Sequence, residues 1–173
     1  HGKFRRQRQM CIRDSLQRVK TIAEACAADM ISKNIFQWNE KYPSRDVFKN
    51  DIMNNSLYIS KQGDVITGCI VISTKKDHVY KNIDWLSKDY MNIYIHRLAV
   101  HPDYQKKGIG KSLMTFAEEY AKINDFKSIR LDTFSKNIRN NKFYKSINYS
   151  QLGNVFFPMQ SEYPFHCYEK IID

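Results

Sequence analysis

A short loop with two glycines and two lysines, QKKGIG at residues 105–110, has the residue types of an anion-binding site. The residues before it, 91–100 (MNIYIHRLAV), are rich in apolar side chains and predict a buried strand. The residues after it, 111–123, place apolar side chains at helical spacing and predict an amphipathic helix. A helix N-terminus offers unpaired N–H groups and a positive dipole end, which both favour phosphate. The glycines let the backbone approach a phosphate without a Cβ in the way.

Two common phosphate-binding patterns do not fit this loop. Gly110, Lys111 and Ser112 look like the end of a Walker A motif, but the opening glycine of that motif would fall at Gln105. The dinucleotide-binding fingerprint also fails, because its third glycine would fall at Leu113. What remains is Gln-x-x-Gly-x-Gly after a strand that ends LAVHP. This pattern resembles the acetyl-CoA motif of the GNAT superfamily of N-acetyltransferases.

The composition indicates one globular domain. The chain has 173 residues, of which 42% are hydrophobic and 13% aromatic. No apolar run approaches the ~20 residues that a membrane helix needs, and no apolar segment typical of a signal peptide follows the basic N-terminus. The four cysteines lie far apart without metal-ligand spacing, so we expect a reduced, cytoplasmic environment and no metal. They are Cys11, Cys26, Cys69 and Cys167.

The net charge of +10 would by itself suggest a nucleic-acid binder. However, residues 5–15 (RRQRQMCIRDS) resemble the translation of a transposase-type sequencing adapter, and a genuine basic tail is the alternative. Five basic residues against one acidic residue give residues 1–15 a charge of +4, so the remaining chain carries +6. This smaller charge also suits a polyanionic cofactor, and we expect no nucleic-acid partner.

Helical and strand patterns alternate along the rest of the chain. Ser44 is expected to cap the second helix, and Gly68 to mark a bulge in a β-hairpin strand. Residues 75–90 form a polar connection with apolar side chains that should fold back on the body. The predicted helices cover residues 16–30, 44–52, 111–123 and 137–146, and the predicted strands cover residues 57–59, 65–74, 91–100, 128–132, 151–157 and 165–172.

The GNAT resemblance covers residues 16–172 and implies an α/β (α+β) fold. It implies a mixed, mostly antiparallel twisted sheet of about six to seven strands, splayed at the central strand and flanked by about four helices. The first strand of the family should lie just before Leu16, within the adapter-like segment. We therefore expect residues 1–15 to be non-native and residues 16–173 to form a single N-acetyltransferase domain that lacks its native first strand.

The resemblance also implies how acetyl-CoA is held as a cosubstrate. The pantetheine arm should pair with the central strand, and a backbone N–H near Leu98 should donate to the acetyl carbonyl oxygen. The pyrophosphate should lie on backbone amides of the loop, whose lysines could add charge near the 3′-phosphate or be ordinary solvated lysines. The implied cofactor-binding residues are Leu98, Ala99, Val100, Gln105, Lys106, Lys107, Gly108, Ile109, Gly110, Lys111 and Asn137.

Asn137 and Tyr144 lie two helical turns apart and can face the same way. NIRNNKFY resembles the family motif in which the Asn contacts the cofactor arm and the Tyr reaches the sulfur. A phenol with a pKa of ~10 can donate a proton to a thiolate at neutral pH, which implies that Tyr144 is the general acid. The alternative is that Tyr144 only packs in the core. Asn148 stands where the family usually has Gly, and Asn tolerates the left-handed backbone of a helix stop.

The general base has two candidates on the predicted central strand. Tyr94, His96 and Leu98 alternate onto one face of that strand. The resemblance places base candidates at His96 and Tyr94, and the ordinary pKa of a histidine suits His96, acting directly or through water. A structural role for His96 is the alternative. His101, which precedes Pro102, is expected to order the turn.

The resemblance places acceptor specificity in residues 37–42 and 156–166, both rich in aromatic and amide side chains. Two acidic residues there could hold a cationic amine, although a packed aromatic cluster is an equal alternative. Glu40, Glu162 and His166 are further candidates for the base or for acceptor contacts. The predicted acceptor-binding residues are Trp38, Glu40, Tyr94, Phe157 and Glu162.

These features predict an N-acetyltransferase that moves an acetyl group from acetyl-CoA directly to a primary amine in a ternary complex. The acceptor is a small molecule or a peptide, and the protein is a monomer or a homodimer without metal or membrane partner. Its rival is a noncatalytic acyl-CoA-binding regulatory module. The rival shares the loop and the fold but not the need for Tyr144.

Overall fold

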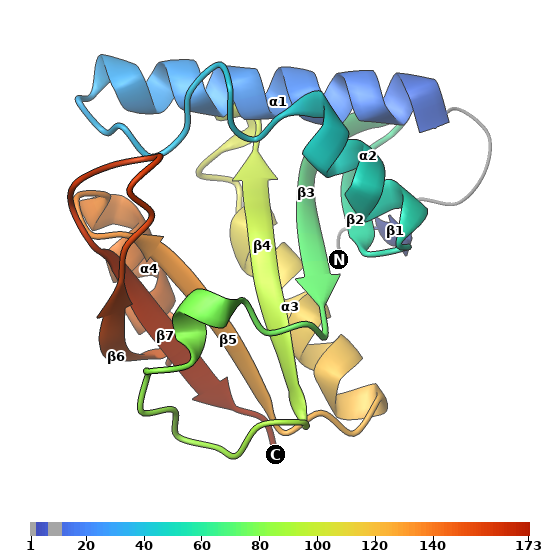
Figure 1. Cartoon of the computed structure of the whole chain (residues 1–173). Helices are drawn as coiled ribbons and strands as arrows, with labels where there is room; N and C mark the ends of the chain where they lie inside the picture. The colour runs from blue at the N-terminus through green and yellow to red at the C-terminus, as the bar shows by residue number, and fades with distance from the viewer. Residues whose placement is uncertain (1–2, 7–11) are drawn as a thin grey trace. The chain divides into compact units, whose positions relative to one another are not determined.

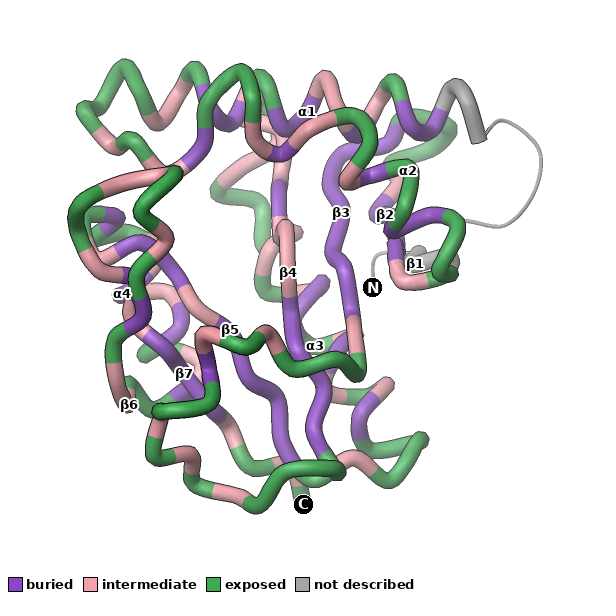
Figure 2. Tube along the Cα trace, viewed as in Figure 1, coloured by how far each residue is buried: buried purple, intermediate pink, exposed green. Residues whose placement is uncertain are grey.

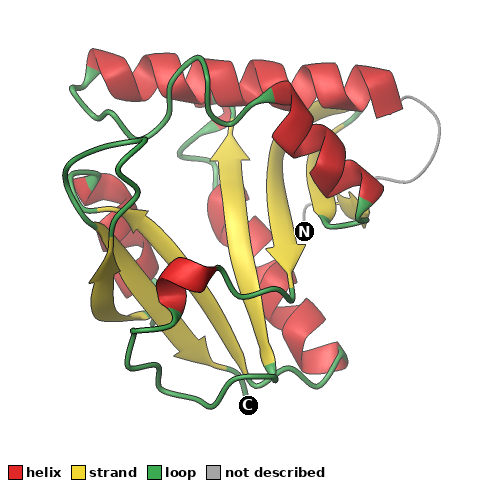
Figure 3. Cartoon of the chain, viewed as in Figure 1, coloured by secondary structure: helices red, strands yellow, loops and turns green. Residues whose placement is uncertain are grey.

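The computed structural model describes residues 3–6 and 12–173, with side chains described from Ser15 onward. The described residues contain seven strands and four α-helices (Figure 3). They divide into two compact units, and β4 (Asn92–Val100) belongs to both of them. Unit 1 consists of the residues up to Ile72 and His96–Phe116, and unit 2 consists of Ser73–Ile95 and Ala117–Asp173. The strand order is β1-β2-β3-β4-β5-β7-β6, a mixed sheet as predicted.

Unit 1 combines one side of the sheet with two contacting helices, α1 and α2 (Figure 1). β2 pairs antiparallel with both β1 and β3, so the predicted hairpin is confirmed. The predicted helix cap is also confirmed, because the Ser44 hydroxyl accepts a hydrogen bond from the Val47 N–H at 3.2 Å. The elements are β1 (Lys3–Arg6), α1 (Ile12–Ser32), α2 (Arg45–Met53), β2 (Leu57–Gln62), β3 (Val65–Ser73), the end of β4, the 3-10 turn η2 (Pro102–Tyr104) and the start of α3 (Ile109–Ile123).

Apolar side chains of α1, α2 and the strands form the core of unit 1. Val19 and Ile22 of α1 are fully buried, as the helical spacing predicts. β3 is buried along almost its whole length (Figure 2), which agrees with its nearly continuous apolar sequence. Trp38 belongs to the same core cluster.

Gly68 lies beside a bulge and allows β3 to approach β4 closely. The pairing with β2 shifts between Ser60, opposite Gly68, and Lys61, opposite Ile66, so one extra residue of β3 is accommodated there. A Cβ added at Gly68 would lie 2.8 Å from the carbonyl oxygen of Ala99. A side chain at this position would therefore push against backbone that cannot easily move.

Ordered backbone extends into the segment expected to be non-native. β1 pairs antiparallel with β2, and α1 begins at Ile12, four residues before the predicted start. A strand therefore occupies the position where the native first strand was expected to be missing. Strand pairing uses main-chain groups, which every sequence supplies. Residues 1–2 and 7–11 lie outside the described residues, and the non-native origin of residues 1–15 stays a prediction.

Unit 2 contains the other side of the sheet and helix α4. β4 pairs in parallel with β5 only from Asn92 to Tyr94, whereas β5 pairs with β7 along its full length. The short ladder agrees with the predicted opening of the sheet beside the central strand. The elements are the 3-10 turn η1 (His78–Tyr80), the start of β4, the end of α3, β5 (Ser128–Phe134), α4 (Ile138–Ser146), β6 (Ser150–Val155) and β7 (Phe165–Ile171).

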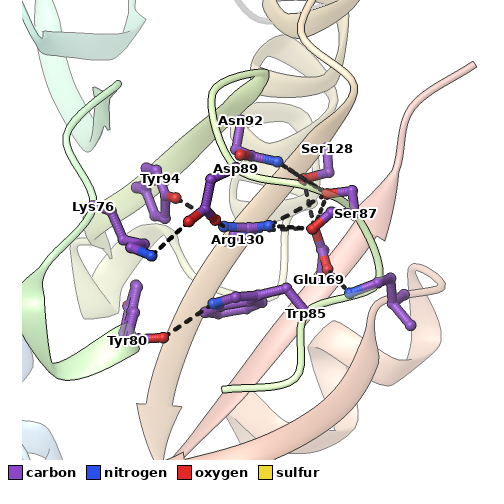
Figure 4. A network of polar contacts seen from close by, with 11 residues as sticks. Lys76, Tyr80, Trp85, Ser87, Asp89, Asn92, Tyr94, Ser128, Arg130 and Glu169 are labelled. Carbon is purple, nitrogen blue, oxygen red and sulfur yellow. Dashed lines mark hydrogen bonds and ion pairs between the residues drawn. The ribbon is translucent and has the colours of Figure 1, made fainter. Parts of the chain in front are cut away.

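A fully buried guanidinium, that of Arg130 on β5, ties several parts of unit 2 together (Figure 4). Its Nε donates to Glu169 of β7 at 3.0 Å, and its Nη1 donates to Asp89 at 2.7 Å and to the Tyr94 hydroxyl at 2.9 Å. Its Nη2 donates to the Ser87 carbonyl oxygen at 2.7 Å. Buried charge is tolerated because every nitrogen of the guanidinium has an acceptor.

The connection between β3 and β4 is fixed by this network, as the predicted folding-back of residues 75–90 requires. The Leu86 N–H and the Ser87 hydroxyl both donate to Glu169, and the Tyr80 hydroxyl donates to Asp132. The indole ring of Trp85 lies 4.5 Å from the Arg130 guanidinium. These contacts make the connection a packed part of unit 2.

Three cysteines, Cys26, Cys69 and Cys167, are buried. Burial raises the pKa of Cys69 to about 12, and it also raises the pKa of Cys167. The described cysteines therefore behave as small core side chains. Within the described residues, no helix is both long and apolar enough to span a bilayer.

Replacing Gly68 by Ala should lower the free energy of unfolding by about 1–3 kcal/mol, because the new Cβ meets backbone. Gly153→Ala is the matched control. Its Cβ would also meet an atom at 2.8 Å, but that atom is the movable tip of Ile83. We expect Gly153→Ala to change stability by less than about 1 kcal/mol in urea unfolding. Equal costs at the two positions would contradict the assigned role of Gly68.

Candidate active site

The QKKGIG loop in unit 1 leads directly into the N-terminus of α3, which begins at Ile109. Lys106 and Gly108 both have left-handed backbone, with φ of 63° and 80°. The Ser112 N–H donates to the Gly108 carbonyl oxygen at 3.0 Å, so the amides ahead of Ser112 have no acceptor within the helix. A turn with left-handed residues before such a helix start makes a concave group of N–H donors that suits an anion.

Positive side chains surround this helix start. Lys106, Lys107 and Lys111 are exposed, and within the described chain none of them is paired with an acidic side chain. The Lys107 ammonium lies 5.4 Å from the centre of the Tyr104 ring. These charges add to the helix dipole and favour a polyanion at this end of α3.

The loop and α1 each bond to the end of β4 through a side chain whose role the sequence pattern did not explain. The Gln105 side chain donates to the Val100 carbonyl oxygen at 2.9 Å, and the Cys26 thiol donates to the same oxygen at 3.1 Å. The Gln105 N–H donates to the Pro102 carbonyl oxygen, so this member of the predicted set of phosphate-binding amides already has an acceptor. His101 orders the turn as predicted, since its Nδ1 accepts from the Asp103 N–H at 3.1 Å.

The end of β4 carries an irregularity at Arg97, whose φ is +47°. A left-handed residue interrupts extended geometry, on which the predicted alternation of His96 and Leu98 onto one face depends. His96, Leu98 and Val100 are half-buried, and Ala99 is buried. The kink changes the direction of the backbone just before the residues predicted to hold the pantetheine arm. The sequence gives no local sign of it, because Arg rarely adopts this conformation.

The Arg97 side chain forms a fork with Asp51 of α2 in which both N–O distances are 2.7 Å. A third bond of 3.3 Å reaches the Tyr42 hydroxyl. Sequence reasoning missed this cluster. Two signals were present: an arginine in a mostly apolar strand, and Asp51 on the apolar face that Val47 and Phe48 define on α2.

In unit 2, Asn137 and Tyr144 lie on the buried side of α4, with 4% and 5% of their surfaces exposed. The Asn137 side chain caps the helix by accepting from the Asn140 N–H at 3.0 Å. Burial raises the pKa of Tyr144, so the phenol stays protonated well above neutral pH. Asn148 has a φ of +71° and ends the helix in left-handed geometry, as predicted for an Asn in place of Gly.

Asp132 of β5 is a carboxyl group that the sequence did not single out. It accepts a hydrogen bond from the Tyr80 hydroxyl, and its charge also contributes to the raised pKa of Tyr144. Burial raises the pKa of Asp132 to about 6, although the bond from Tyr80 acts in the opposite direction. Unit 2 therefore contains a carboxyl group whose pKa is raised to about 6 and whose charge acts on Tyr144.

The residues predicted to bind the acceptor have different environments within their units. Trp38 packs in the core of unit 1, while Glu40 is exposed. Tyr94 is buried against Arg130 in unit 2. Phe157 makes an edge-to-face contact of 5.0 Å with Phe165, Glu162 is exposed, and His166 bonds to Asn154 at 2.7 Å. Their acceptor roles stay predictions, with Trp38 and Tyr94 already engaged in packing or hydrogen bonding.

No group of three or more His, Cys, Asp or Glu side chains within the described residues is arranged to hold a metal ion. In unit 1 the loop offers backbone amides and lysines, and in unit 2 the buried groups include the Tyr144 phenol and the Asp132 carboxyl group. Amides and lysines suit binding of a phosphorylated group, and a buried phenol suits proton donation.

Similar architecture occurs in solved acetyltransferase structures. An acetyltransferase of the GNAT family from Streptococcus agalactiae has a TM-score of 0.80 at 20% identity, covering 99% of this chain and 96% of that one. The PaiA N-acetyltransferase from Thermoplasma acidophilum, in complex with coenzyme A, has a TM-score of 0.71 at 17% identity and covers 99% of both chains. The ribosomal-protein-S18-alanine N-acetyltransferase from Escherichia coli has a TM-score of 0.70 at 13% identity, covering 100% of this chain and 95% of that one.

These likenesses define the fold as that of GNAT acetyltransferases. The family model described as "Acetyltransferase (GNAT) family" matches residues 21–149, and no curated protein matches the chain. The chain therefore belongs to the GNAT family of acetyltransferases. The match includes the loop, β4 and the α4 segment from Asn137 to Tyr144.

Asp132→Asn should stabilise the protein at pH 8 and have no effect below about pH 4. The folded pKa of about 6 lies above the unfolded value of 3.8, so ionisation destabilises the fold as pH rises between these values. Asn keeps an acceptor for Tyr80 but carries no charge. We expect a gain of about 1–3 kcal/mol at pH 8 in urea unfolding. The exposed Asp84→Asn serves as control, and a pH-independent effect of Asp132→Asn would contradict the assignment.

Proposed function

We propose that this protein transfers an acetyl group from acetyl-CoA to a primary amine, by direct attack of the amine in a ternary complex. The observation that carries the proposal is the start of α3, where left-handed Lys106 and Gly108 precede a helix N-terminus flanked by exposed lysines. Family membership supports acetyl transfer, and a similar fold is known in complex with coenzyme A. The phosphates of acetyl-CoA match this group of amide donors and nearby lysines.

The proposed reaction gives each predicted residue a separate role. The amine nitrogen attacks the thioester carbonyl carbon, a C–N bond forms, and the C–S bond breaks. The amine proton passes to His96 directly or through water, and the departing thiolate takes the proton of Tyr144. A backbone N–H near Leu98 stabilises the developing oxyanion. The raised pKa of Tyr144 keeps the phenol protonated at neutral pH, so its proton is present when the thiolate leaves.

The acceptor class is a primary amine of a small molecule or a peptide. The aromatic and acidic residues in segments 37–42 and 156–166 support it, because exposed Glu40 and Glu162 carry negative charge. One protein of similar fold is described as acting on the alanine of a ribosomal protein. A screen of polyamines, amino acid amides and N-terminal peptides therefore covers the chemistry that these segments can recognise.

Gly108→Glu should weaken acetyl-CoA binding at least about tenfold, because it removes the left-handed freedom of the turn and adds a negative charge beside the phosphates. Gly63→Glu is a matched control. Gly63 also has positive φ, with open space around the added Cβ, but lies in the β2–β3 turn. Calorimetric titration should show wild-type affinity for Gly63→Glu. Equal loss in both variants, or no binding by the folded wild-type protein, would refute the loop assignment.

Tyr144→Phe should lower kcat about 100-fold and leave the Kd for acetyl-CoA unchanged, because only the proton donor is removed. Tyr149→Phe is the matched control: Tyr149 is also buried in unit 2, and its hydroxyl bonds to Glu118. We expect Tyr149→Phe to keep its activity. An unchanged kcat in Tyr144→Phe would show that another group is the acid. Tight binding without transfer by the wild-type protein across the amine panel would instead favour the acyl-CoA-binding module.

A further inference from the structure

Arg97 has a strained backbone within a strand, and its side chain explains how the strain is held. A φ of +47° is unfavourable for an arginine, so surrounding contacts must enforce it. The guanidinium reaches Asp51 with two bonds of 2.7 Å, and only 14% and 10% of the two side chains are exposed. The Arg97 carbonyl oxygen also accepts from the Cys69 thiol at 3.5 Å. The kink is thus fixed from α2 and from β3.

The electrostatics of this pair favour a fixed geometry. Burial opposes the charged form of Arg97, but the bonds and charge of Asp51 prevail and raise its pKa. A planar fork satisfies both carboxylate oxygens at once, which a lysine cannot do. Replacing a buried ion pair by apolar side chains is often neutral for stability, so stability alone does not explain its presence.

The third donor of Arg97 connects the kink to segment 37–42. The Tyr42 hydroxyl accepts from Nη1 at 3.3 Å. The position of Tyr42 is set in turn by Asn39, whose side chain accepts from the Tyr42 N–H at 3.1 Å and whose N–H donates to the Tyr42 carbonyl oxygen at 3.0 Å. One guanidinium therefore contacts both the helix that fixes β4 and a segment 55 residues earlier in the chain.

We propose that Arg97 is a positioning residue whose bonds to Asp51 and Tyr42 couple the conformation of segment 37–42 to the direction of the Leu98 N–H. This inference rests on the proposed function, in which the N–H near Leu98 stabilises the oxyanion and segment 37–42 contacts the acceptor amine. A movement of Tyr42 on acceptor binding is transmitted through the guanidinium to the residue that precedes the oxyanion donor. The acceptor thereby influences transition-state stabilisation as well as its own binding.

Three variants test separately the backbone conformation of Arg97, its two bonds to Asp51 and the hydroxyl of Tyr42. Arg97→Gly allows positive φ but removes the side chain, and Arg97→Lys keeps the charge but loses the fork. Tyr42→Phe removes only the hydroxyl. Arg45→Lys is the matched control, because Arg45 is an exposed arginine of α2 that bonds to Gln17.

We expect Arg97→Gly and Arg97→Lys to lower kcat at least about tenfold, with the Kd for acetyl-CoA within about twofold of wild type. Tyr42→Phe should raise the KM for the acceptor several-fold and also lower kcat, whereas Arg45→Lys should change neither. If the bond between Arg97 and Tyr42 were purely structural, Tyr42→Phe would lower the stability of the protein and leave kcat unchanged. Wild-type kcat and KM in Arg97→Gly would overturn the proposal.

An NMR measurement tests the coupling without any activity. Backbone chemical shifts of residue 97 report its φ, and those of Leu98 report the adjacent N–H. Asp51→Asn and Tyr42→Phe should each shift these resonances in the folded protein, and Arg45→Lys should not. Unchanged resonances in both variants would overturn the coupling even if the enzyme is active. A wild-type protein that transfers no acetyl group, but shows these shifts, would refute the proposed function and leave the coupling intact.

Discussion

The structure of unit 2 depends on a single charge that has been removed entirely from water. Transfer of the Arg130 guanidinium into the interior costs several kcal/mol unless its donors are satisfied, and Glu169, Asp89, Tyr94 and Ser87 satisfy them. The acceptors come from β7, from β4 and from the connection between β3 and β4. Loss of any one acceptor would leave a buried N–H group of the guanidinium with one hydrogen bond fewer. The Arg130 cation therefore favours folding of these segments together.

Unit 1 uses an arginine differently. Arg130 lies in regular strand geometry and its bonds gather segments around it, whereas Arg97 departs from that geometry and its bonds hold the departure in place. In both cases the charge is on a strand of the sheet. In each unit a buried arginine therefore connects segments that are far apart in sequence. In unit 2 these segments pack around Arg130, and in unit 1 they hold the left-handed backbone of Arg97.

Periodic features were predictable from sequence and long-range polar contacts were not. Apolar spacing located the strands and helices to within a few residues, and the QKKGIG pattern located the start of α3, because these depend on nearby residues. The left-handed φ of Arg97 depends on Asp51, 46 residues away, and no local pattern encodes it. Trp38 packs in the core of unit 1, since an aromatic among polar neighbours does not reveal which side is buried, and its acceptor role stays a prediction. Catalytic roles for His96 and Tyr144 remain predictions.

The burial of Cys26, Cys69 and Cys167 bears on how a reaction of this protein can be followed. The thiolate is the reactive form of cysteine, and a thiol with a pKa of about 12, as at Cys69, is almost wholly protonated at pH 8. A dissolved thiol reagent also has little access to a side chain in a packed core. In a colorimetric thiol assay, these three residues would therefore contribute little of the signal from a small thiol released into solution. They need not be alkylated before such an assay.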